Sequence, residues 1–101
     1  MGYHSLLLEL MRGIADAPLR ASIARAFLAV VEGYRYGVLD DRKLRAVLAE
    51  FCLDVLSVKY PTRDVEELRP EAERCSEKLY GAVRAATLAE RYTRTSGTGV
   101  G

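Results

Sequence analysis

Apolar residues recur at intervals of three and four along most of this 101-residue chain, and this spacing restricts the folds open to it. Such a period places the apolar side chains on one face of an α-helix. No stretch alternates apolar and polar residues for long enough to predict a strand. The sequence therefore predicts an all-α fold: a compact bundle of four or five helices with a long C-terminal helix, forming a single domain over residues 1–94.

Two helices are expected in the first part of the chain, separated by a proline-containing break. The first begins with Ser5 as its N-cap and ends near Ala15. Its apolar residues cover most of the helix surface, which predicts deep burial. The second runs from Pro18, a residue suited to a first helical turn, to Tyr36. Gly37 follows directly and is a natural helix stop.

A third helix is predicted to begin after Asp40 and to end near Lys59. Asp40 is a typical N-cap, and Leu39 with Leu44 occupy the two positions of a hydrophobic staple around it. The stripe of this helix that is expected to face the core comprises Leu44, Val47, Leu48, Phe51, Cys52, Val55 and Leu56.

The last helical segment is the longest, from Thr62 to about Arg94, and Pro70 lies inside it. Because proline in a helix interior costs about 3 kcal/mol or more, we expect a short turn of helix before Pro70 and a fresh start there. Residues 95–101 are rich in Gly and Thr and have no apolar face. They are expected to form a flexible tail.

A stripe of apolar residues follows the last segment at alternating spacings of three and four, as in a coiled-coil seam. Its members are Val65, Leu68, Ala72, Cys75, Leu79, Ala82, Ala86 and Ala89. The stripe can pack against the other helices of its own bundle. Alternatively, its C-terminal part extends past the shorter helices and pairs with a second copy or a protein partner. The residues expected at that interface are Ala82, Ala85, Ala86, Ala89 and Tyr92.

The link between the second and third helices is basic and carries tyrosines, which indicates nucleic-acid binding as an alternative function. Two helices joined by a Gly-containing turn are typical of helix-turn-helix proteins. The residues expected to contact nucleic acid are Tyr34, Arg35, Arg42, Lys43, Arg45, Arg91 and Arg94. Against this alternative, Asp40 and Asp41 would face the phosphates, and a net charge of +1 provides no broad basic surface.

Residues arranged for catalysis or for binding a metal are not evident. No nucleophile elbow, phosphate-binding loop, zinc-protease motif or calcium loop occurs, and His4 lies too near a chain end to be a good general base. Two carboxylate pairs have i,i+4 spacing but lack the histidines of a di-metal bundle; they are Glu50 with Asp54 and Glu73 with Glu77. We predict a non-catalytic interaction module, self-associating or part of a larger assembly, without cofactor or metal.

The two cysteines, Cys52 and Cys75, form no CxxC motif and cannot complete a zinc site with a single histidine. They are expected to be reduced thiols of the core. A disulfide between them is the alternative, because some hyperthermophiles keep disulfides inside the cell.

The chain contains neither Asn nor Gln. Both side chains deamidate when hot and are rarer in heat-adapted proteins, which predicts a thermophilic source. A GC-rich genome would explain 12 Arg against 3 Lys, but it would not remove Gln. No apolar run approaches the roughly 20 residues that span a membrane, and the first residues lack a basic signal region. We therefore expect a cytoplasmic protein without a membrane partner.

Overall fold

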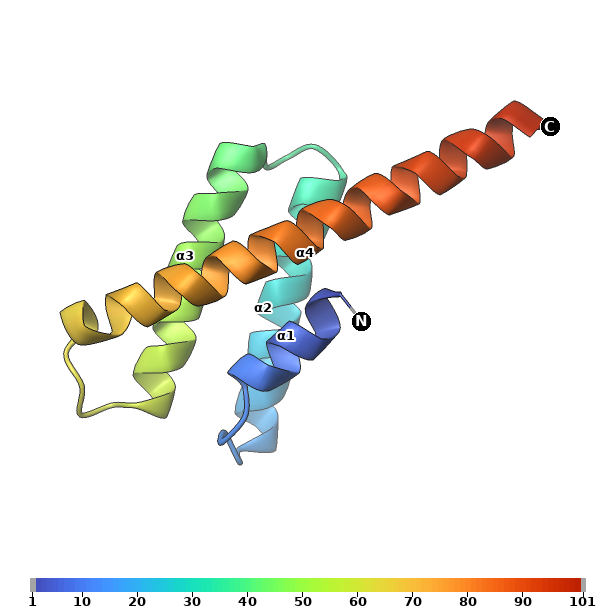
Figure 1. The fold of residues 1–101 in the computed structure, drawn as a ribbon. Coiled ribbons are helices and arrows are strands. Elements are labelled where there is room, and N and C mark those ends of the chain that lie inside the picture. The colour runs from blue at the N-terminus through green and yellow to red at the C-terminus, as the bar shows by residue number, and fades with distance from the viewer. Residues whose placement is uncertain (1, 101) are drawn as a thin grey trace.

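Four α-helices make up the part of the chain that the structure describes. The structure, a computed structural model, describes the backbone of residues 2–100 and the side chains of residues 2–92. The helices are α1 (Tyr3–Leu10), α2 (Ala17–Arg35), α3 (Asp41–Lys59) and α4 (Val65–Val100), as Figure 1 shows. No strand occurs among these residues, so the predicted all-α class is confirmed.

Helices α2 and α3 run antiparallel beside one another, and α4 crosses them on one side (Figure 1). The most extensive helix contact is that of α3 with α4, and α1 packs against both of these helices. Two side chains fix the end of α1. The guanidinium of Arg20 donates to the carbonyl oxygens of Met11 and Ile14 at 3.0 and 3.1 Å. The ammonium group of Lys59 donates to the carbonyl oxygen of Leu10 at 2.9 Å.

The predicted bounds and full burial of the first helix were wrong. The helix begins at Tyr3 with Gly2 as its N-cap, two residues before Ser5, and it ends at Leu10 rather than Ala15. Gly13 then adopts a positive φ of 94°, a conformation that ends a helix and is easily reached by glycine. The helix is amphipathic and is not buried on all sides, because Leu7 and Leu10 are buried while Leu8 is 58% exposed.

The connection between α2 and α3 follows the local signals of the sequence. Tyr36 is the C-cap of α2, and Gly37 has a φ of 82°. The amides of Gly37 and Val38 donate to the carbonyls of Tyr34 and Gly33 at 3.2 and 2.8 Å, which is the hydrogen-bond pattern of a Schellman motif. The side chain of Asp40 then accepts from the amide of Lys43 at 2.8 Å and caps α3 as predicted.

Replacing Gly37 with alanine is expected to destabilise the fold by about 1 kcal/mol, because an L side chain is strained at this positive φ. An added methyl group would meet no atom within 4 Å, so the cost would come from the backbone alone. Gly81→Ala is the matched control, since Gly81 lies in a helix with equally open space around it and should gain about 0.5–1 kcal/mol. Urea unfolding measures the difference at protein concentrations at which light scattering shows a single chain, so that self-association does not contribute. An equal effect of the two substitutions would contradict this explanation.

Helix α4 is continuous through Pro70, so the predicted restart at this residue was wrong. The helix begins at Val65 rather than Thr62, and the carboxylate of Glu67 accepts from the amide of Asp64 at 3.0 Å, as in half of a capping box. Pro70 has no amide hydrogen, so one hydrogen bond of the helix is missing. The packing of the next turns of α4 against α3 offsets the free-energy cost of this loss. At its other end the helix runs to Val100, beyond the expected end near Arg94, and flexibility of residues 95–101 stays a prediction.

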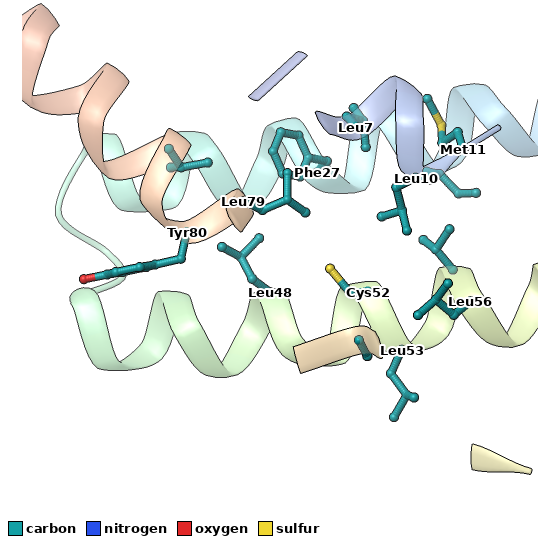
Figure 2. Packing of buried hydrophobic residues seen from close by; sticks show 14 of the residues in the cluster. Leu7, Leu10, Met11, Phe27, Leu48, Cys52, Leu53, Leu56, Leu79 and Tyr80 are labelled. Atoms are coloured by element: carbon teal, nitrogen blue, oxygen red, sulfur yellow. The ribbon is translucent and has the colours of Figure 1, made fainter. Parts of the chain in front are cut away.

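The core lies where all four helices meet. Leu7, Phe27, Leu48 and Leu79 come from α1, α2, α3 and α4, and their side chains point toward a common centre in Figure 2. Phe27, Leu48 and Leu79 have no exposed surface. The Phe27 ring lies 5.6 Å from that of Phe51, within the range of favourable aromatic pairs.

The C-terminal part of α4 continues past the ends of the other helices (Figure 1). Its 36 residues span about 54 Å, against about 28 Å for the 19 residues of α2 or α3. The molecule measures 56 × 28 × 21 Å, so α4 alone accounts for its length. None of the helices in the described part of the chain is long and apolar enough to cross a membrane.

Candidate interaction surface

Helix α4 has an inner face that packs on the other helices. Its buried residues are Leu68, Ala72, Ser76, Leu79, Tyr80, Val83 and Thr87. The predicted seam agrees with this face only at Leu68, Ala72 and Leu79, because Val65 is 45% exposed and Cys75 is half-buried. Ala86 and Ala89 are exposed, although the seam predicted that they face the core. Val83 and Thr87 are buried on the inner face instead. A straight helix has 3.6 residues per turn, so a strict seven-residue repeat drifts around it by about 20° per heptad.

The opposite side of α4 carries the surface that we call the outer face. It consists of the exposed residues Gly81, Ala85, Leu88, Ala89 and Tyr92. Ala86 is also exposed, but it follows Leu79 by seven residues and therefore lies outside this face. Gly81, Ala85, Leu88 and Tyr92 follow one another at spacings of four, three and four, which places them in one line along the helix. Leu88 is 47% exposed and Tyr92 is 76% exposed. No member of this face is charged.

The charged residues between positions 81 and 92 lie on the side of α4 that turns toward α2 and α3. Arg35 of α2 donates to Glu90 in a bidentate ion pair, with Nε 2.8 Å from Oε1. The Nε atom of Arg84 lies 3.8 Å from Oδ2 of Asp41 at the start of α3. Arg91 borders a groove between α4 and the α2–α3 connection. These charged side chains therefore lie beside the packed face of α4, and the outer face carries no charge.

The groove beside Arg91 has a volume of about 430 Å³ and contains a buried tyrosine. The Tyr34 hydroxyl donates to Oδ1 of Asp41 at 2.6 Å. Burial, followed by this hydrogen bond, raises the pKa of Tyr34 above its ordinary value of 10.0. Leu88 borders both the groove and the outer face, so the two surfaces are continuous.

Alkaline pH is expected to destabilise the protein through Tyr34. The fold favours the neutral phenol, so the native state keeps a proton that the unfolded chain loses near pH 10. This contribution to stability is present below pH 10 and is lost as the pH rises through the raised pKa. The unfolding free energy of Tyr34→Phe should therefore fall less steeply than that of the wild type between pH 9 and about 11.5. Parallel urea titrations test this, and identical pH slopes for the two proteins would contradict it.

The residues predicted to bind nucleic acid do not form one accessible basic patch. Tyr34 is buried and Arg35 is paired with Glu90. The Arg45 guanidinium lies 4.4 Å from the ring centre of Tyr80. The remaining members of the set are Arg42 and Lys43, which are exposed at the start of α3, Arg91 at the groove, and Arg94, whose side chain lies outside the described residues. Because α2 and α3 are antiparallel neighbours, they also lack the crossed arrangement of a helix-turn-helix (Figure 1).

The residues predicted at an interface lie mostly on the exposed surface of α4. Ala85, Ala86, Ala89 and Tyr92 are exposed, and Ala82 is half-buried at the border of the outer face. The sequence analysis missed Gly81 and Leu88. Their signal was present, because both continue the spacing of three and four through Ala85 and Tyr92.

No arrangement for metal binding is found among the described residues, where His, Cys, Asp and Glu side chains form no group of three that could hold an ion. Comparisons of the chain with protein-family models, with curated proteins and with solved structures found no match. Among the described residues, the outer face of α4 is an exposed, uncharged line on a helix that continues past the others.

Proposed function

We propose that this protein is a non-catalytic helical interaction module that self-associates through the outer face of α4. The observation that carries the proposal is an uncharged, exposed apolar line of residues on a helix that extends beyond its own fold. Exposed apolar patches of this kind mark interaction sites in otherwise polar protein surfaces. The absence of Asn and Gln supports a thermophilic source for the module.

The residue types of the outer face favour a second helix as the partner. Gly81 and Ala85 are small, and an added methyl group at Gly81 would meet no atom within 4 Å, so another helix can approach closely there. Leu88 and Tyr92 supply larger apolar area next to this small-residue segment. Packing one helix surface into the groove of another requires such a combination of ridges and depressions.

The absence of charge favours a second copy of the same chain. In a two-fold dimer the same surface of both copies meets at the interface. A charged residue on that surface would therefore lie close to like charges of the other copy, which is unfavourable. The outer face avoids this problem because Arg84 and Glu90 point toward α2 and α3, where they are paired. Two-fold dimers are also the most common closed assemblies of soluble proteins.

Light scattering coupled to size-exclusion chromatography tests the proposal on the full chain. The expected result is a molar mass that rises with loading concentration from that of the 11.2 kDa chain to twice that value. A mass equal to a single chain at every concentration up to about 1 mM would reject self-association, since a Kd above that value corresponds to less than about 4 kcal/mol of binding free energy.

A further inference from the structure

A second feature of the molecule, unrelated to the outer face, is a cavity of about 420 Å³ between the end of α1, the end of α3 and the second turn of α4. Cys75 lines this cavity and is half-buried. The basic residues that share the lining are Arg12, Lys59, Arg74 and Lys78, and the acidic ones are Glu9 and Glu71. A small molecule in the cavity can therefore reach the Cys75 sulfur in a mainly basic environment.

The second cysteine lies directly behind the first. Cys52 of α3 has no exposed surface and does not line the cavity. Figure 2 shows its sulfur directed toward the interior of the helix packing. The two thiols interact across the α3–α4 packing, and this interaction is the largest cause of two opposite shifts: it lowers the pKa of Cys75 and raises the pKa of Cys52. Lys78 and Lys59 further lower the pKa of Cys75.

We propose that Cys75 is an oxidation site for small hydroperoxides and that Cys52 is its resolving thiol. The assignment rests on three observations: Cys75 lines the cavity, Cys52 of α3 is closed to solvent in the core, and Cys75 packs against that core from α4. Redox-sensitive cysteines typically combine solvent access, a basic environment and a neighbouring thiol.

The reaction balances with the hydroperoxide as the only oxidant. The Cys75 thiolate attacks one peroxide oxygen, so an S–O bond forms, the O–O bond breaks, and the leaving oxygen takes a proton as water or alcohol. The Cys52 sulfur then attacks the Cys75 sulfenic acid. An S–S bond forms, the S–O bond breaks, and water leaves with the Cys52 proton. The two electrons given up by the thiol pair reduce the peroxide.

The product would be a disulfide that joins α3 to α4 and closes the chain between positions 52 and 75. Cross-linking a loop of this length restricts the unfolded chain. The oxidised protein should therefore melt at least about 5 °C above the reduced protein.

Hydrogen peroxide on the full chain tests the order of the two steps by mass spectrometry after denaturation and alkylation. Wild type should lose both free thiols within one chain. Cys52→Ala should accumulate a sulfenic acid at position 75 that dimedone traps. Cys75→Ser should keep Cys52 reduced for at least about tenfold longer, because that thiol is buried. Alanine is chosen at position 52 so that no polar group enters the core, and circular dichroism checks that each variant folds.

Two charge variants provide a matched control for the cavity. Lys78→Met should slow oxidation of Cys75 by about threefold, and Glu71→Gln should accelerate it by a similar factor, since these charges act on the thiolate in opposite directions. The proposal would be overturned if Cys52 in Cys75→Ser reacted as fast as the wild-type thiols. It would equally be overturned if wild type formed only disulfides between chains.

Discussion

Leu88→Glu is expected to convert the proposed dimer into a monomer while leaving the fold of the chain intact. Leu88 is 47% exposed in the single chain, so a partner has about half of the leucine surface left to cover. Full burial of a leucine contributes about 1.5–3 kcal/mol. Half of that, counted once for each copy of a two-fold dimer, is about 2 kcal/mol.

The introduced carboxylates add a larger penalty, because an unpaired charge buried at an interface costs several kcal/mol. Together the two effects should weaken the dimer by at least about a hundredfold in Kd. Folding should be unaffected, since the side chain at this position already contacts solvent in the single chain. Sedimentation equilibrium measures the dissociation constant, and thermal unfolding measures stability.

Leu28→Glu is the matched control for this prediction. Leu28 lies on α2 and is 42% exposed, close to the value for Leu88. The same leucine is therefore replaced by the same glutamate at a similar exposure, but on another helix. It should leave the dissociation constant within about twofold of the wild-type value. Dissociation caused by Leu28→Glu, with Leu88→Glu still dimeric, would assign the interface to α2 instead of the outer face.

Phe27→Ala is expected to be the most destabilising single substitution in the core, with a loss of about 3–5 kcal/mol in unfolding free energy. Phe27 has no exposed surface, and its ring contacts those of Tyr3 and Phe51 at centre distances of 5.5 and 5.6 Å. Removing it leaves a cavity that three helices border. Because a domain of this size is typically stabilised by about 5–15 kcal/mol, the variant should be close to unfolding at elevated temperature.

Urea unfolding followed by circular dichroism measures this loss, with Leu8→Ala as the control. Leu8 is also a large apolar residue, but it is 58% exposed, so its truncation should cost less than about 1 kcal/mol. Similar midpoints for the two variants would show that the residues around Phe27 collapse into the space or that the helices pack differently.

Local signals in the sequence determined the parts of the fold that were predicted well. The cap at Asp40 and the stop at Gly37 depend on residues within one helical turn, so their positions could be inferred from the neighbouring side chains. Continuity through Pro70 could not, because it depends on the packing of α4 against α3, a contact between residues far apart in the sequence. The same is true of α1, whose end is fixed by Arg20 and by Lys59.

The exposure of part of the proposed outer face was predictable from spacing. Residues three and four apart lie on one side of a helix, and Ala85 and Tyr92 were expected on the exposed side of α4, where they lie. Their role in an interface stays a prediction. The rotation of α4 about its axis was not predictable, since it is set by the packing of buried residues such as Leu79 and Val83 against segments that are distant in the sequence. The ion pair with Glu90 explains why Arg35, a predicted nucleic-acid contact, is engaged within the fold.

A single tryptophan at position 92 offers the most direct measurement of whether the outer face is covered by a second copy. The chain has no tryptophan of its own, so Tyr92→Trp reports on this position alone. As the protein concentration rises through the dissociation constant, the fluorescence emission of this tryptophan should shift to shorter wavelength. Iodide should quench the emission less at the same time. Leu8→Trp on α1 should show neither change. A tryptophan at position 92 that stays fully open to iodide while light scattering reports a dimer would contradict the assignment of the interface to the outer face of α4.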